Sequence, residues 1–130
     1  MKYVIMIHSN PEPWGHPTSD YLAAHQDLPD EVRHRLNADF EQVMTELHAN
    51  GELIGGEALG APSTARLYRW HDGTPLASDG PYSEAKEHLA GFFLVDVEDQ
   101  ARAEAVAARF AGPGETVELR PLMWPGGDDQ

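Results

Sequence analysis

The sequence predicts an α+β fold in which two helices pack on one face of an antiparallel sheet. Two continuous apolar segments, residues 2–8 and 91–97, have the composition of buried strands. Two amphipathic segments, one at residues 30–50 and one that ends before residue 112, have the apolar spacing of helices. The resulting order is strand, helix, two or more strands, helix and strand, which is the order of a ferredoxin-like βαββαβ sandwich.

The first strand and the first helix carry the clearest patterns. Residues 3–7 are apolar without alternation, so both faces of this strand are expected to be covered. The helix predicted over residues 30–50 has apolar side chains three or four positions apart, at Val32, Leu36, Phe40, Val43, Met44 and Leu47. Gly51 follows as the residue that ends the helix, and the apolar stripe is expected to pack against a sheet.

Turn signals define the middle of the chain. Residues 53–59 and 65–70 are predicted strands, and Ala61-Pro62-Ser63 separates them. Asp72-Gly73 predicts a tight turn directly after the second of these strands. Short strand pairs are therefore expected between the two helices.

The last two elements follow the second buried strand. Acidic residues at 96–99 favour the start of a helix, because carboxylates stabilise the positive end of the helix dipole. The apolar face of this helix is Ala101, Ala105, Val106 and Phe110, and residues 112–114 end it. Residues 115–122 then form the last predicted strand.

Two segments are expected to lie outside this frame. Residues 9–29 hold four prolines and Gly15, and so long a connection suggests a lid or binding loop around Trp14, with a helical turn or two at residues 18–25. Residues 125–130 are polar, acidic and rich in glycine, and we expect a flexible C-terminal tail. The remaining residues, 1–124, have the length of one domain.

Composition limits the compartment and the partners. The chain has 130 residues, 41% of them apolar, and no cysteine, which excludes disulfides, a thiolate nucleophile and cysteine-ligated metals. Its 22 Asp and Glu against 9 Lys and Arg give a formal net charge of −13, which argues against direct nucleic-acid binding. The apolar run at the N-terminus is too short for a signal peptide or a membrane span, so we expect a soluble cytoplasmic protein without membrane contact.

The two strands that are apolar on both faces predict an oligomer. Helices on one face leave the other face of the sheet without cover, and a second copy of the sheet would supply that cover. We therefore expect a homodimer.

The segment from Asp79 to His88 is the strongest candidate for a site. The Asp79-Gly80-Pro81 turn restricts the backbone, because Gly80 is able to take a positive φ and Pro81 fixes its own φ. Four ionisable side chains follow and are expected at the end of the sheet: Glu84, Lys86, Glu87 and His88. Asp79 is a candidate general base or polar anchor, although Asp is equally a preferred turn former.

Further candidates surround this turn. Glu84, Lys86 and Glu87 have the chemistry of a charged pocket rim, with Lys86 placed to capture an anionic group, and solvated surface is the alternative. Glu57 lies between small residues that leave room for a ligand, and a strand-edge position explains it equally well. His8, at the end of the first strand, is a candidate catalytic proton shuttle or a half-buried structural histidine.

Cofactor motifs are missing from the sequence. The seven histidines show neither a His-Glu-x-x-His motif nor a compact ligand triplet, so no metal site is expected. No dinucleotide fingerprint, phosphate-binding loop or nucleophile elbow occurs either. We therefore expect no cofactor.

A family resemblance covers four segments in sequence order, residues 1–7, 55–59, 79–93 and 117–122. These segments resemble the YCII-related family, in the branch named after an Asp-Gly-Pro-Phe motif, with Tyr82 in place of the Phe. The resemblance implies a dimeric α/β barrel in which two sheets face each other, and we include Tyr82 among the ligand-binding candidates. A His and Asp pair has been proposed as catalytic in the family, with the His on the first helix. Phe40 stands at the matching position here, so we do not transfer that pair.

Two classes of function remain open. One is an enzyme that acts on a small oxidised or aromatic metabolite with acid–base groups and no cofactor, in a cavity between sheet and helix or between subunits. The resemblance raises this class, because ferredoxin-like dimeric barrels include lactone isomerases and monooxygenases. The other is a non-catalytic ligand-binding or regulatory protein, which the link of the branch to extracytoplasmic-function sigma factors suggests.

Overall fold

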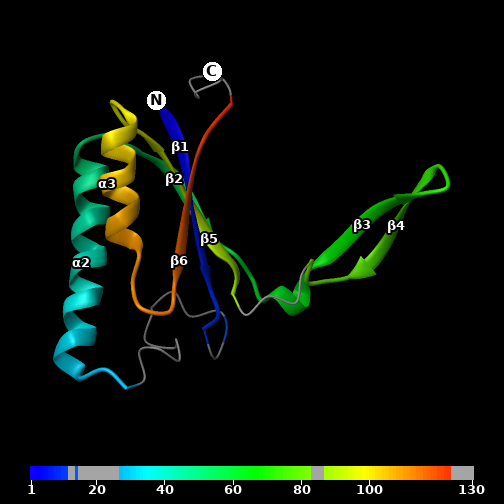
Figure 1. Ribbon diagram of the computed structural model, residues 1–130, viewed down its shortest axis with the longest axis horizontal. Helices are drawn as coiled ribbons and strands as arrows, with labels where there is room; N and C mark the ends of the chain where they lie inside the picture. The colour runs from blue at the N-terminus through cyan, green and yellow to red at the C-terminus, as the bar shows by residue number, and fades with distance from the viewer. Residues whose placement is uncertain (12–13, 15–26, 83–86, 124–130) are drawn as a thin grey trace.

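The computed structural model describes residues 1–11, 14, 27–82 and 87–123 (Figure 1). Its elements in chain order are β1 (Lys2–Ser9), α2 (Asp30–Ala49), β2 (Leu53–Ala58), a 3₁₀ turn (Pro62–Thr64), β3 (Arg66–His71), β4 (Thr74–Asp79), β5 (His88–Asp96), α3 (Gln100–Phe110) and β6 (Thr116–Pro121). The predicted α+β class is confirmed, and the element order is consistent with a ferredoxin-like sandwich.

The central sheet has four strands in the order β2-β5-β1-β6, and each neighbouring pair is antiparallel. β1 lies between β5 and β6, so that Ile5 is opposite Phe93 on one side and opposite Leu119 on the other. α2 and α3 lie next to each other on one face of this sheet (Figure 1). The chain thus forms a helix layer and a sheet layer, as the sequence predicts.

The hydrophobic core lies between these two layers. Its fully buried side chains come from two strands and both helices: Tyr3, Ile5, Val43, Leu47, Val95 and Val106. Val43 and Leu47 are one helical turn apart on α2, so the predicted apolar stripe is confirmed as the packing face at these two positions. Val32, Leu36 and Met44 of the stripe are half-buried, and Phe40 is exposed.

Local contacts explain where α3 begins and where α2 ends. Asp99 precedes α3, and its Oδ1 accepts a hydrogen bond from the backbone N–H of Arg102 at 2.8 Å. Gly51 follows α2 with a φ of 70°, a left-handed conformation that glycine adopts at little cost. α3 therefore begins after a residue that favours a helix start, and α2 ends before a residue that favours a helix end.

One arginine of α3 ties the helices to the start of β2. The guanidinium of Arg102 donates to both carboxylate oxygens of Glu52, at 2.8 and 3.0 Å, and to Glu46 at 3.0 Å. These two carboxylates hold the pKa of Arg102 above its usual range, and the hydrogen bonds from Arg102 lower the pKa of Glu52. Because Glu52 lies between α2 and β2, the network fixes α3 against that connection.

The sheet face opposite the helices is apolar at its centre. Val4 and Met6 alternate with the buried core residues of β1, and they lie opposite Leu94 and Phe92 of β5. All four side chains are half-buried, and we call them the open face. Within the described part of the chain the helices cover one face of the sheet, so the described residues do not supply the expected cover on both faces.

β3 and β4 form a separate hairpin instead of two further strands of the central sheet. Asp72 and Gly73 connect them with φ values of 47° and 83°, so the predicted tight turn is confirmed. Every residue of β4 is exposed. The hairpin extends from the sheet on the side away from the helices (Figure 1).

One boundary differs from the prediction in a way that affects the site. β5 begins at His88 and not at residue 91, so His88 belongs to the sheet. The predicted tail at residues 125–130 and most of the predicted binding loop at residues 9–29 lie outside the described residues. Among the residues that the structure describes, no helix has the length and apolar character needed to cross a membrane.

Candidate functional site

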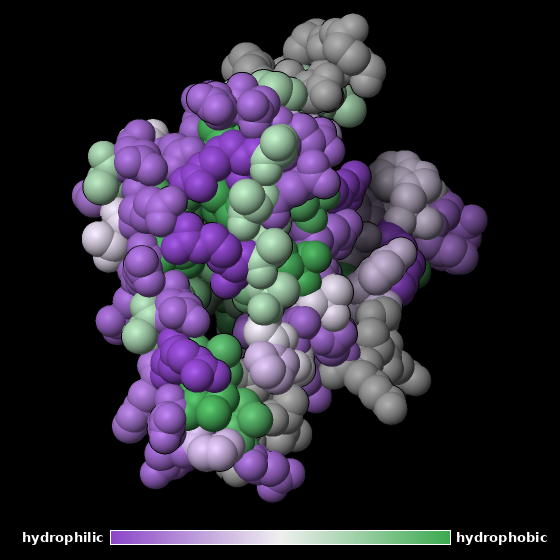
Figure 2. All heavy atoms as spheres, turned by 60° about the vertical axis from the view of Figure 1, so that its left-hand side comes forward, coloured by the Kyte–Doolittle hydropathy of each residue, from purple (hydrophilic) through white to green (hydrophobic). Residues whose placement is uncertain are grey.

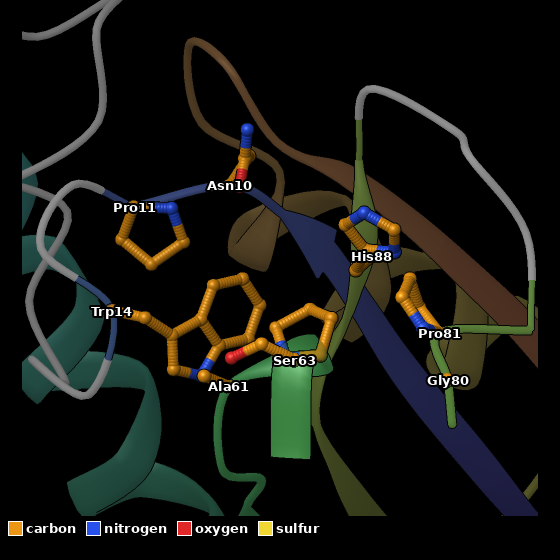
Figure 3. A pocket seen from close by; sticks show the side chains of 9 residues that line it. Asn10, Pro11, Trp14, Ala61, Ser63, Gly80, Pro81 and His88 are labelled. Atoms are coloured by element: carbon orange, nitrogen blue, oxygen red, sulfur yellow. The ribbon is translucent and has the colours of Figure 1, made fainter. Parts of the chain in front are cut away.

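Segments from four parts of the chain surround a hollow of about 400 Å³ at one end of the sheet (Figure 3). The lining residues are Asn10, Pro11, Trp14, Ala61, Pro62, Ser63, Gly80, Pro81 and His88. They follow β1, precede and form the 3₁₀ turn, follow β4, and begin β5. Apolar walls with a few polar groups are typical of small-molecule sites of this size. We call this site the Trp14 hollow.

Trp14 forms one wall of the hollow, with Pro11 on the same side (Figure 3). The indole Nε1 of Trp14 donates a hydrogen bond to the backbone oxygen of Leu59 at 3.0 Å. The backbone N–H of Leu59 in turn donates to the oxygen of Ala90 in β5 at 2.8 Å. The polar edge of the indole is therefore satisfied by a residue anchored to the sheet, and its apolar faces are left for contacts in the hollow.

His88 and Pro81 form the opposite wall (Figure 3). The peptide bond between Gly80 and Pro81 is cis, and the N–H of Gly80 donates to the backbone oxygen of Ala65 at 2.8 Å. A Cβ added to Gly80 would lie 2.6 Å from the Cβ of Ala65, whereas the φ of Gly80 is outside the left-handed region. Glycine is thus needed for the close approach of two backbone segments, and the expectation of a positive φ at this position is wrong.

A pair of acidic side chains lies at the same end of the sheet. Glu87 precedes His88, and both of its carboxylate oxygens accept from the hydroxyl of Thr116, at 2.8 and 3.2 Å. Burial, and to a lesser degree the charge of Glu87, raise the pKa of Glu115 to about 7. Glu115, which lies close to the start of β5 and β6, therefore keeps its proton to a higher pH than an ordinary glutamate does.

His8 lies at this end of the sheet but does not line the hollow. Its Nε2 lies 3.0 Å from Oε1 of Glu118, and the two residues come from the neighbouring strands β1 and β6. The role of His8 as a catalytic proton shuttle stays a prediction.

Asp79 is absent from the lining of the hollow. Its Oδ1 accepts from a guanidinium nitrogen of Arg66, its partner across the β3–β4 ladder, and both side chains are largely exposed. This ion pair closes the base of the hairpin, which is the behaviour of a structural turn residue. The assignment of Asp79 as a general acid or base stays a prediction.

The remaining candidates are spread over other surfaces. Glu57 lies opposite Phe92 in the β2–β5 ladder and is exposed. Tyr82 is 81% exposed, and the guanidinium carbon of Arg69 lies 5.8 Å from its ring centre. Glu84 and Lys86 lie outside the described residues. The structure therefore does not bring Glu57, Tyr82 and Asp79 together in one pocket.

Phe40, the position where the resemblance would place a catalytic histidine, belongs to an aromatic cluster. Its ring centre lies 5.7 Å from that of Phe110 and 6.3 Å from that of Phe93, and the last two rings stack at 4.9 Å. These contacts are of the kind that stabilise packing between helix and sheet. The phenyl ring of Phe40 does not supply the ionisable group that the proposed acid–base pair needs at this position.

Several residues of the site were not singled out by the sequence. Asn10 and Ser63 carried no motif, and Glu115 was treated only as the start of a strand. Their positions depend on contacts between segments that are far apart in the chain. The long, proline-rich connection at residues 9–29 was the one sequence signal that indicated the region of Trp14 in advance.

The fold and the site together define an α+β sandwich with a loop-lined hollow at one end of its antiparallel sheet. The sequence pattern of the YCII-related domain matches residues 1–122, which is nearly the whole chain. The chain therefore belongs to the YCII-related domain family. A search of curated proteins found no match to this chain.

Proposed function

We propose that this YCII-related protein binds a small, flat and uncharged metabolite in the Trp14 hollow. The observation that carries the proposal is the indole of Trp14, which is fixed by its bond to Leu59 and lies across the hollow from His88 and Pro81 (Figure 3). A ring held in this way offers a large apolar surface without losing conformational freedom on binding. Flat, unsaturated ligands match that surface best.

The polar groups of the hollow define the rest of the ligand. Asn10, Ser63 and His88 supply hydrogen-bond donors and acceptors, and no Lys or Arg occurs among the described lining residues. The acidic pair at Glu87 and Glu115 lies nearby, and the whole chain has a net charge of −13. These charges disfavour a carboxylate or phosphate ligand and favour an uncharged one.

His88 is the group in the hollow that suits acid–base chemistry. Among the described lining residues it is the ionisable one, and imidazole is the side chain most often used in general acid–base catalysis. Its position at the start of β5 holds it on the sheet instead of on a loop. Proton transfer between His88 and the bound metabolite, without a cofactor, is the chemistry that this arrangement supports.

The proposed assembly is a homodimer in which the open faces of two sheets pack together. Val4, Met6, Phe92 and Leu94 form a central apolar area on that face, and apolar sheet faces in water are normally covered by a second layer. The helix side is mostly hydrophilic, with hydrophobic residues confined to smaller areas (Figure 2). The open face is therefore the better candidate for the dimer contact.

The binding proposal is tested with three small probes of matched size. Benzamide is flat and uncharged, benzoate has the same shape with a negative charge, and cyclohexanecarboxamide has the same amide on a puckered ring. Benzamide is expected to bind with a dissociation constant of about 1 mM, which is within the limits for so small a molecule. The other two probes are expected to bind at least about fivefold more weakly, because like charge or poor stacking opposes them.

Titrations followed by backbone amide chemical shifts locate the binding site. Trp14→Ala should abolish the benzamide shifts of residues around the hollow, whereas Trp70→Ala, which removes a tryptophan from the distant hairpin, should leave them unchanged. Equal loss in both variants, or benzoate binding as tightly as benzamide, would refute the proposed site or the proposed ligand class.

A further inference from the structure

The β3–β4 hairpin exposes large apolar side chains that the described part of the chain leaves uncovered. Tyr68 is 68% exposed, Trp70 is 74% exposed and Leu76 is 52% exposed. We call residues Arg66–Asp79 the arm. Trp70 is a costly residue to leave in water, because tryptophan is one of the side chains that contribute most to protein interfaces.

The two faces of the arm differ in chemistry. Tyr68 lies opposite Ala77, and Trp70 lies opposite Pro75, so these four residues share one face. The other face carries the intervening residues, which are mostly polar: Leu67, Arg69, His71, Thr74, Leu76 and Ser78. The aromatic face is therefore the better docking surface of the two.

The arm needs support that the described chain does not give it. Its strands pair with each other in a two-stranded sheet separate from the central one. Isolated two-stranded hairpins are marginally stable in water, and further packing is what normally stabilises them. An arm with an aromatic face is thus expected to have a partner.

The direction of the arm indicates a second copy of this chain as that partner. The arm extends on the side of the sheet that carries the open face, away from the helices (Figure 1). A second sheet packed on the open face would therefore lie alongside the arm. The position of the partner beside the arm rests on the homodimer of the proposed function.

Charge favours the same partner. Residues 66–79 contain two arginines and two aspartates, whose charges cancel. The arm is therefore close to neutral, while the chain as a whole has a net charge of −13. Two acidic bodies repel each other where their charged surfaces meet. The neutral arm is a part of the surface that approaches another copy without that repulsion.

From these observations we infer that each arm clasps the partner subunit of a homodimer, with Tyr68 and Trp70 packed against the flank of the partner. The aromatic face is then buried in the dimer, and the stacked sheets and the two arms form one continuous interface. The Trp14 hollow remains within a single chain, so loss of the arm contact does not remove the ligand site.

Sedimentation equilibrium of the full chain tests this inference. The wild type is expected to be a dimer, and the double variant Tyr68→Ser, Trp70→Ser should raise the dimer dissociation constant at least about 30-fold, the size of effect seen when aromatic anchors are truncated. Leu76→Ser, on the opposite face of the same hairpin, should change it less than about threefold. All of these side chains are exposed, so the variants are expected to fold, and circular dichroism checks that they do.

The outcomes separate the inference from the proposals on which it rests. A wild-type monomer at all concentrations would overturn both the homodimer and the arm contact. A wild-type dimer that the double variant leaves unchanged would overturn the arm contact alone. Benzamide titration of the double variant tests the ligand site independently, and binding is expected to be unchanged.

Tryptophan quenching supplies a second readout. With Trp14 and Trp124 replaced by Phe, emission comes from Trp70 alone. Acrylamide should quench this emission strongly below the dimer dissociation constant and at least about threefold less above it, because burial shields the indole. Equal quenching at both concentrations would show that Trp70 stays exposed in the dimer and would overturn the inference.

Discussion

Replacing Glu115 by Gln is expected to stabilise the protein at alkaline pH and to have little effect in acid. Burial and the charge of Glu87 raise the pKa of Glu115 to about 7, whereas the ordinary value is 4.5. The folded state therefore binds a proton at this group more tightly than the unfolded state does. Stability from this group is fully present below pH 4.5 and is lost as the pH rises through 7.

The magnitude follows from the difference in pKa. A shift of that size corresponds to about 3 kcal/mol when the carboxylate is fully ionised. Glu115 is only partly buried, and solvent screening reduces the expected effect to about 2 kcal/mol. Gln resembles the protonated carboxyl in shape and hydrogen bonding, so Glu115→Gln removes this cost without removing the side chain.

Urea unfolding of the wild type and the variant at about pH 5 and about pH 8 measures the effect, because the other titrating groups cancel in the comparison. The variant should be more stable by about 2 kcal/mol at the higher pH and by less than about 1 kcal/mol at the lower pH. Glu104→Gln, at an exposed position on α3, is the control and should show no such difference. A gain for Glu115→Gln that is equal at both pH values, or no gain at all, would refute the reasoning.

Three further predictions concern the parts of the fold that hold the site. Gly80→Ala should lower the free energy of unfolding by about 1–3 kcal/mol, because its Cβ would collide with the hairpin base, while Gly55→Ala, which has open space, should cost far less in the same urea titration. Arg102→Met should destabilise by about 1 kcal/mol at neutral pH, and the loss should shrink as the pH falls below 4.5, because the pKa of Glu52 is lowered by this arginine and its protonation ends the ion pair. Asp79→Asn should change thermal unfolding by less than about 1 kcal/mol, since its ion pair is exposed; a larger loss would show that the hairpin base depends on it.

Helix ends and turns were predictable because their causes are local. The Asp99 carboxylate accepts a hydrogen bond from the backbone N–H of Arg102, three residues later in the chain. Gly51 takes a left-handed φ directly after α2. The Asp72-Gly73 turn likewise depends only on the residues that form it. The spacing of apolar residues was sufficient to predict α2, because the helical period alone places Val43 and Leu47 on the same face, and that face is buried in the core.

The site was less predictable because it depends on contacts between distant segments. Trp14 is fixed by Leu59, and Gly80 is constrained by Ala65, and neither contact leaves a spacing pattern in the sequence. The elevated pKa of Glu115 depends on burial and on the carboxylate of Glu87, which lies just before β5. An aspartate before Gly-Pro indicated a site, yet a hairpin partner, Arg66, was available to pair with it.

Local sequence signals also did not predict that the arm would form a sheet separate from the central one. Strand propensity predicts that residues 66–79 form a hairpin, but a hairpin has the same local pattern inside a sheet and outside it. Only the exposure of Tyr68 and Trp70 in three dimensions shows that this aromatic face is uncovered in the described part of the chain, and the proposed partner contact rests on that exposure.

Native mass spectrometry of the untagged protein, purified gently from its host, tests the central claim most directly. The account predicts a dimer that retains a small uncharged molecule, and it predicts that Trp14→Ala purified in the same way lacks this molecule. A molecule retained equally by the wild type and by Trp14→Ala would place binding outside the Trp14 hollow and would contradict the account.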